Sequence, residues 1–154
     1  GKDEQGKDVL MMWNRCATNY NVSVSYSYDA GAIWSEASEW KLSGPSSRIN
    51  ARTLDSGNVL YVHHYNTLSR EKMCVSLSTD GGVTFPHRLI VDNRSDVSYP
   101  DIAVADNGDI YVTWDGNRYG VREILYTKLT EQQLLAAGDG DIMDAANIIT
   151  IASK

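Results

Sequence analysis

The sequence predicts an all-β fold built from four-stranded antiparallel sheets that repeat along the chain. The first observation is a pattern of serine, aspartate, glycine and a final aromatic residue, which occurs at residues 27–34 (SYDAGAIW) and again at 78–85 (STDGGVTF). The second is a glycine just ahead of an apolar run, at Gly57 before VLYVHH and at Gly108 before IYVTWD. Both patterns recur after 51 residues, and a repeat of about 50 residues lies in the range of β-propeller blades.

The repeated serine and aspartate pattern has the chemistry of a turn. Asp29 and Asp80 can accept backbone N–H bonds across the turn, and the glycine two residues later permits a positive φ. The final aromatic residue, Trp34 or Phe85, can pack beneath the hairpin. We therefore expect both aspartates to be structural, and the repeat to fix the register of the sheets.

Composition indicates a packed globular unit and restricts its partners. Of the 154 residues 42% are hydrophobic, with four Trp and nine Tyr, which is enough for a core. The net charge is −6 with both signs interspersed, which argues against nucleic acid and anionic membrane surfaces. No apolar run approaches the ~20 residues that span a bilayer. We expect neither nucleic acid nor membrane as a partner.

The two cysteines and the polar first residues bear on metal binding and on the cell compartment. Cys16 and Cys74 fall on predicted strands without metal-ligand spacing, so we expect core thiols, no metal and no cofactor. The opening GKDEQGKD shows no signal peptide, and the compartment stays open on residues alone.

Three units follow from the repeat. Residues 1–43 form a partial unit with strands over 9–16, 22–28 and 39–42, and residues 44–95 form a full unit with strands over 49–54, 59–65, 72–77 and 88–92. Residues 96–154 form the last unit, with strands over 99–105, 110–114, 123–129 and 147–152. Thr130 followed by Gln133 is a capping-box signature, so a short helix is expected near 130–137, ending at Gly138.

Three such units do not close a ring. Either the chain is part of a longer protein, or two copies assemble and cover their open sheet edges. A homo-oligomer that closes the ring is therefore a possible partner arrangement.

The repeat also predicts which residues share one end of the sheets. Turns alternate between the two ends of a four-stranded sheet, so the loop joining the second and third strands lies opposite the Asp-containing turn, beside the start of the first strand. Several arginines and aromatic rings at such a mouth suit an acidic sugar, because guanidinium groups pair with carboxylates and rings stack on sugar faces. The residues expected there are Trp13, Asn14, Arg15, Arg48, His63, His64, Tyr65, Arg70, Tyr99, Trp114, Asp115 and Arg118.

These motifs resemble a known family. The serine and aspartate pattern is similar to the Asp-box, or BNR repeat, of sialidases (neuraminidases) and related six-bladed β-propellers. The runs RCATNYNVSVSYSYDAGAIWSE, SREKMCVSLSTDGGVTF and YPDIAVADNGDIYVTWD resemble successive sialidase segments, and VREILYTKLTEQQLLAAG resembles the finish of a bacterial branch. The resemblance implies that Arg15 and Arg70 bind a substrate carboxylate and that Tyr99 is the catalytic tyrosine. It also favours a secreted or periplasmic location.

A tyrosine suits this chemistry because sialic acid carries a carboxylate on its anomeric carbon, which would repel a carboxylate nucleophile, and sialidases use a tyrosine in that role. A phenol with a pKa near 10 needs a base at neutral pH. The resemblance implies a glutamate at the start of the preceding inner strand, and in this chain Arg48 aligns there. Arg48 cannot accept the proton, but it could lower the pKa of Tyr99.

Three functions remain open at this point. The first is a sialidase-like glycoside hydrolase acting on an acidic terminal sugar, with Arg48 and Asp115 also contacting the substrate. The second is a uronate polysaccharide lyase that uses His63 or His64 as base. The third is a glycan-binding or assembly module without catalysis. The arginines could also be surface residues, and Tyr99 a core ring.

Overall fold

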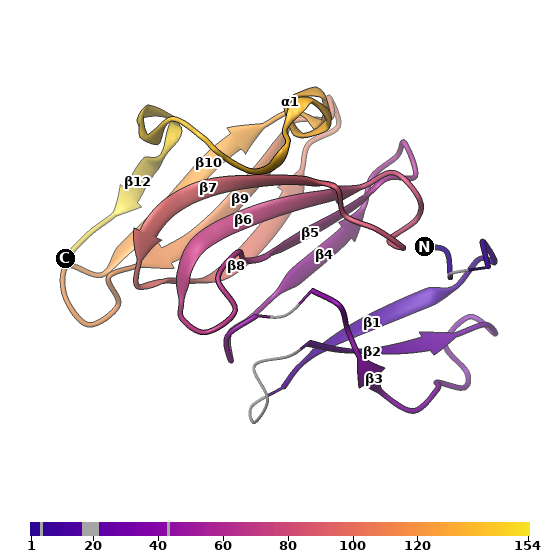
Figure 1. Ribbon diagram of the computed structural model, residues 1–154. Coiled ribbons are helices and arrows are strands. Elements are labelled where there is room, and N and C mark those ends of the chain that lie inside the picture. Colours follow the sequence, from indigo (N-terminus) through magenta and orange to yellow (C-terminus); the bar gives the residue numbers. More distant parts are fainter. Residues whose placement is uncertain (4, 17–21, 43) are drawn as a thin grey trace.

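The chain folds into three consecutive β-sheets, and the computed structural model describes residues 1–3, 5–16, 22–42 and 44–154 (Figure 1). Residues 17–21, which belong to one of the segments that carry the family resemblance, lie outside the described residues. The sheets have three, five and four strands in chain order, and we call them blades 1, 2 and 3. The predicted all-β fold is confirmed.

Neighbouring strands in each blade are consecutive in the chain, except that the outermost strands of blades 2 and 3 come from later in the chain. Blade 1 contains β1 (Leu10–Arg15), β2 (Val22–Ser27) and β3 (Ser38–Glu39). Blade 2 contains β4 (Asn50–Thr53), β5 (Val59–His64), β6 (Glu71–Ser78), β7 (His87–Ser95) and β11 (Asp139–Ile142). Blade 3 contains β8 (Val97–Val104), β9 (Ile110–Gly116), β10 (Glu123–Leu129) and β12 (Ile149–Ala152).

The glycine turns repeat in atomic detail. The N–H of Gly57 donates to the Leu54 carbonyl at 2.9 Å in blade 2, and Gly108 makes the same 2.9 Å bond to Ala105 in blade 3. Gly6 supplies a third copy, 51 residues earlier, with a 2.9 Å bond to Asp3. All three glycines have φ between +80° and +87°, where a side chain would be strained. The 51-residue spacing therefore holds for three successive turns.

The two Asp-boxes also share the same hydrogen bonds. In the first, the Ser27 hydroxyl donates to Asp29 at 2.8 Å and accepts the Gly31 N–H at 2.9 Å, while the Ile33 N–H donates to Asp29 at 2.9 Å. The corresponding bonds of the second box, centred on Asp80, measure 2.7, 2.8 and 2.8 Å. The predicted turn role of both aspartates is confirmed by these contacts.

Two apolar clusters hold the blades together, and both depend on β5. All six side chains of this strand are buried. Val59 and Tyr61 face blade 1, where Tyr61 lies 5.6 Å from Trp13 between ring centroids. Leu60 and Val62 face blade 3. The apolar run VLYVHH is continuous because a strand between two other sheets is buried on both sides.

The helix near 130–137 is confirmed as α1 (Glu131–Ala136), with both bonds of the Thr130 and Gln133 capping box present. No helix in the described part of the chain is long and apolar enough to cross a membrane.

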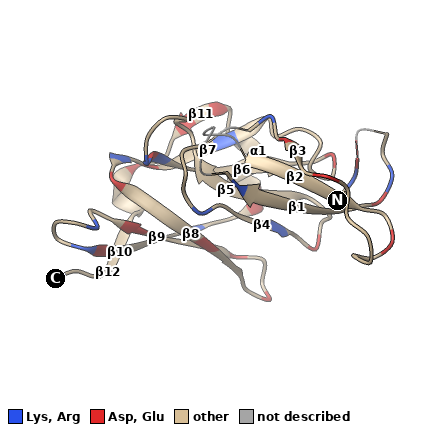
Figure 2. Cartoon of the chain, turned by 90° about the horizontal axis from the view of Figure 1, so that it is seen from below, with Lys and Arg blue, Asp and Glu red and all other residues tan. Residues whose placement is uncertain are grey.

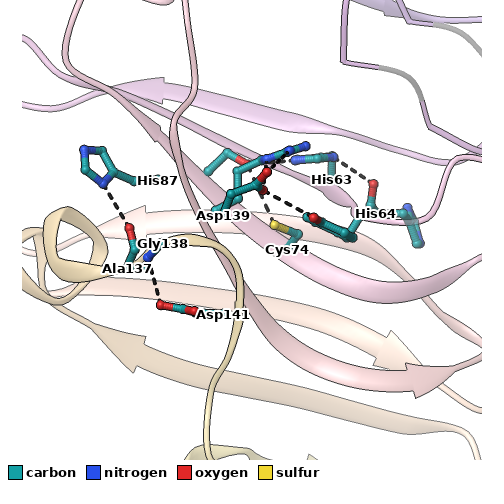
Figure 3. A network of polar contacts seen from close by, with 11 residues as sticks. His63, His64, Cys74, His87, Ala137, Gly138, Asp139 and Asp141 are labelled. Carbon is teal, nitrogen blue, oxygen red and sulfur yellow. Dashed lines mark hydrogen bonds and ion pairs between the residues drawn. The ribbon is translucent and has the colours of Figure 1, made fainter.

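After α1 the chain takes a path that the sequence did not predict. β11 returns to blade 2 and pairs with the outer strand β7 in parallel, so blade 2 has a fifth strand and is not purely antiparallel. Arg88 of β7 forms an ion pair with Asp139 at 2.6 Å, and His87 Nδ1 bonds the Ala137 carbonyl at 3.0 Å (Figure 3). The polar run DGDI lacks the apolar alternation by which a strand is recognised.

Several strand boundaries also differ from the prediction. The outer strand of blade 2 extends over His87–Ser95 rather than 88–92, and that of blade 1 is Ser38–Glu39 rather than 39–42. The predicted last strand begins later, at Ile149, because Asp144 caps a short 3₁₀ helix over Ala145–Asn147.

The removal of an Asp-box aspartate tests the role of these turns. We expect Asp80→Ala to lower the free energy of unfolding by about 2 kcal/mol, because Asp80 accepts bonds from Ser78 and Thr84. Urea denaturation would measure the loss. Asp106→Ala, an exposed aspartate at another turn, serves as the control; equal losses in both variants would contradict the turn role.

Candidate functional site

Tyr99 occupies a strained position at the start of blade 3. Its φ is +55°, which is uncommon for a bulky side chain, and the next residue is Pro100. The pairing of β8 with β9 is irregular between Ser98 and Asp101, as at a β-bulge. Bulges and left-handed residues often redirect a side chain at a functional site. The local backbone therefore sets the direction of the Tyr99 ring.

Three arginines surround this ring, and we call them the arginine cluster: Arg15, Arg70 and Arg118. Arg15 Nη1 donates to the Tyr99 hydroxyl across 3.5 Å. The guanidinium carbon of Arg118 lies 4.1 Å from the ring centroid, and that of Arg70 lies 5.3 Å away. Both distances are within the range of cation–π contacts.

Each blade contributes to the cluster. Arg15 ends β1 in blade 1, Arg70 precedes β6 in blade 2, and Arg118 follows β9 in blade 3. The predicted meeting of Arg15, Arg70 and Tyr99 at one place is therefore observed. Over the chain as a whole, basic and acidic residues are interspersed (Figure 2), so the local gathering of cations is a feature of this site.

The arginine cluster changes the ionisation of Tyr99. Its pKa is lowered from 10.0 to about 8, first by Arg118 and then by the hydrogen bond from Arg15, with the charge of Arg70 adding to the effect. Positive charges close to the phenol favour its ionised form. A substantial fraction of Tyr99 is therefore phenolate in mildly alkaline solution.

Arg48 is not part of the arginine cluster. Its guanidinium pairs with Asp101 at 3.1 Å, and Asn50 donates to the same carboxylate at 2.6 Å. The pKa of Tyr99 is lowered, as expected, but the arginine cluster lowers it. The expectation that Arg48 does so is wrong.

Asp115 supports the cluster through the third arginine. It forms an ion pair with Arg118, with a distance of 2.8 Å to Nε, and accepts a hydrogen bond from Ser98 at 2.7 Å. Asp115 therefore holds Arg118, whose guanidinium also covers the ring of Tyr99. The contact of Asp115 with a substrate stays a prediction.

Both predicted histidines are buried, at 2% exposure for His63 and 1% for His64. His63 bonds the Ser76 hydroxyl and the His64 carbonyl, each at 2.8 Å, and burial lowers its pKa to about 3. His64 bonds the Val97 carbonyl at 2.8 Å, and burial lowers its pKa as well. Both rings thus form hydrogen bonds to protein groups. The charge of Arg70 also lowers the pKa of His64, and that of Asp115 raises it.

Two tryptophans that were expected at the mouth belong to the core. Trp114 is 1% exposed and donates to the buried carboxylate of Asp92 at 2.9 Å. Trp13 packs edge-on against Trp40, with ring centroids 5.8 Å apart. Tyr65 directly follows β5 and lies beneath Arg88 of β7. Of the aromatic residues expected at the mouth, only Tyr99 lies beside the arginine cluster.

The described residues contain no group of three or more His, Cys, Asp or Glu side chains that could hold a metal ion. Cys74 is a buried free thiol whose pKa is raised to about 12 by burial, and Cys16 is free and partly buried.

The repeated glycine turns, the two Asp-boxes and the blade-like sheets define an Asp-box repeat protein. A comparison with protein families finds the BNR repeat-like domain over residues 3–112, and the chain belongs to this sialidase-like family. The matched region contains Arg15, Arg70 and Tyr99 and ends before Asp115 and Arg118. No curated protein matches the sequence significantly.

The ionisation of Tyr99 can be measured by the ultraviolet absorbance of tyrosinate. We expect one of the nine tyrosines to titrate near pH 8, and Arg118→Gln to move that midpoint toward 10. Because the native pKa lies below the unfolded value, ionisation adds stability above pH 8, and this contribution is lost as the pH falls through about 8.

Two further variants make this titration decisive. Tyr99→Phe should remove the early transition. Arg122→Gln, an exposed arginine in the same loop, should leave it in place. An early transition that persists in Tyr99→Phe would belong to another tyrosine and would contradict the assignment.

Proposed function

We propose that Arg15 and Arg70 of the arginine cluster bind the carboxylate of an acidic terminal sugar, and that Tyr99 faces the anomeric carbon of this sugar in a sialidase-like glycoside hydrolase. The observation that carries the proposal is the convergence of Arg15 and Arg70 beside Tyr99 without a carboxylate partner. Among the described residues neither arginine forms an ion pair, whereas Arg48 and Arg118 each do.

Two neighbouring guanidinium groups without a counter-charge favour an anion between them. Their contacts are with neutral oxygens, which leave the positive charge uncompensated. A planar carboxylate fits guanidinium groups through parallel hydrogen bonds. A ligand carboxylate would therefore supply the missing charge at this point.

A bound sialic acid carries its carboxylate on the anomeric carbon and would therefore place that carbon close to the Tyr99 oxygen. In the hydrolase reaction the Tyr99 oxygen, ionised by loss of its proton to solvent, forms a bond to the anomeric carbon while the glycosidic carbon–oxygen bond breaks. The departing oxygen takes a proton from a group outside the arginine cluster, and water then cleaves the tyrosyl intermediate. The lowered pKa of Tyr99 reduces the need for a strong base in the first step.

A second candidate is a glycan-binding module without catalysis. One observation favours it: within the described part of the chain, no carboxylate contacts the Tyr99 hydroxyl. Arg48, which aligns with the position implied for the glutamate, pairs with Asp101 instead. The lyase alternative has less support, because His63 and His64 are both buried and the low pKa of His63, about 3, makes it a weak base.

The arginine role can be tested with free sialic acid in isothermal titration calorimetry. We expect Arg15→Gln to weaken binding by at least about tenfold, because a charge-assisted bond to the carboxylate is lost. Arg52→Gln on the exposed edge of blade 2 is the matched control and should bind as the wild type does. The methyl ester of the sugar should bind weakly to every variant; equal binding of acid and ester would exclude a carboxylate site.

Hydrolysis and binding are separated by a fluorogenic sialoside. Release of the fluorophore by the wild-type protein, and its loss in Tyr99→Phe, would support the hydrolase. Binding of the acid without any release would identify the glycan-binding module. Release at the wild-type rate from Tyr99→Phe would contradict the nucleophile role of Tyr99.

A further inference from the structure

The loop between blades 1 and 2 contacts two arginines of the cluster through a single residue, Ser46. The hydroxyl of Ser46 accepts a hydrogen bond from Arg15 Nε at 3.2 Å. Its backbone carbonyl accepts a hydrogen bond from Arg70 Nη2 at 2.7 Å. Arg15 and Arg70 belong to different blades, so Ser46 links side chains that no strand pairing brings together.

Ser46 is itself held in place by its neighbours. Pro45 and Ser47 on either side are buried, whereas Ser46 is only partly buried. The Ser47 N–H bonds the Pro45 carbonyl at 2.6 Å, which closes a tight turn around Ser46. Proline also fixes the backbone of the turn. The two acceptor oxygens of Ser46 therefore have a defined direction.

A neutral acceptor at this place has an electrostatic consequence. Asp115 holds Arg118 with a full negative charge, which offsets the charge of that arginine. Ser46 holds Arg15 and Arg70 by hydrogen bonds alone, and so leaves both positive charges available. The contact through Arg15 Nε also leaves the terminal nitrogens free to point toward Tyr99, where Nη1 lies 3.5 Å from the hydroxyl.

We propose that Ser46 is a positioning residue of the anion site: it orients Arg15 and Arg70 toward Tyr99 without neutralising them. This inference rests on the proposed function of the arginine cluster. It adds a residue from a segment with no strand or family motif. It also explains how two guanidinium groups are held close together at a site whose ligand is an anion.

The test compares Ser46→Ala with Ser47→Ala in the same turn. The Ser47 hydroxyl is buried and has no hydrogen-bond partner among the described residues, so its removal breaks no described bond. We expect Ser46→Ala to weaken sialic acid binding about tenfold, since a bond to a charged group is lost. We expect Ser46→Thr, which keeps the hydroxyl, to bind within about twofold of the wild type.

A second readout does not depend on any ligand. Ser46→Ala should raise the midpoint of the Tyr99 transition in the tyrosinate titration, because Arg15 is no longer held against the phenol. Ser47→Ala and Ser46→Thr should leave it near 8. Ser46→Cys, which keeps the size of the side chain but accepts hydrogen bonds weakly, is the second variant should Ser46→Ala fold poorly.

The outcomes separate this inference from the proposed function. If the wild-type protein binds no acidic sugar, the proposed function fails, and the Tyr99 midpoint still decides whether Ser46 orients Arg15. If Ser46→Ala and Ser46→Cys match Ser47→Ala in both the midpoint and the affinity, the positioning of Arg15 by the Ser46 hydroxyl is overturned. A shifted midpoint in the Ala and Cys variants that is restored in Ser46→Thr supports it.

Discussion

The whole arrangement depends on the burial of β5 between two other sheets. Its side chains alternate, with Tyr61 packed against blade 1 and Leu60 against blade 3, so blade 2 fixes both neighbours at once. The end of β1 and the starts of β6 and β8 are thereby brought to one place. Arg15, Arg70 and Tyr99 meet because the packing of blade 2 leaves little freedom for their strands.

On this scaffold the site is built mainly by electrostatics. The protein is acidic overall, with a net charge of −6, and several of its arginines are offset by carboxylates. Arg15 and Arg70 differ because the oxygens of Ser46 and Tyr99 are neutral acceptors. These positive charges lower the pKa of Tyr99, whose strained backbone holds the phenol among them.

Much of the fold and part of the site could be predicted from the sequence, because residues 51 apart take equivalent positions in successive blades. The Asp-boxes and glycine turns set the register, and the register located Arg15, Arg70 and Tyr99. It could not foresee side-chain partners. Trp114 aligns with His63, and both face inward from β9 and β5, so neither belongs to the open mouth. The crossing of β11 to blade 2 was missed because its polar sequence relies on contacts such as Arg88 with Asp139.

In the proposed function the same cations would face two competing anions, the Tyr99 phenolate and a ligand carboxylate. A carboxylate bound to Arg15 and Arg70 would offset the charges that lower the pKa of Tyr99, and so would raise that pKa again. By linkage, ionised Tyr99 would weaken carboxylate binding to the same degree. Arg118 is less affected, because its charge is already shared with Asp115 and its guanidinium stays over the ring. The contribution of Arg118 to the ionisation of Tyr99 is therefore the part that would survive if an acidic sugar were bound.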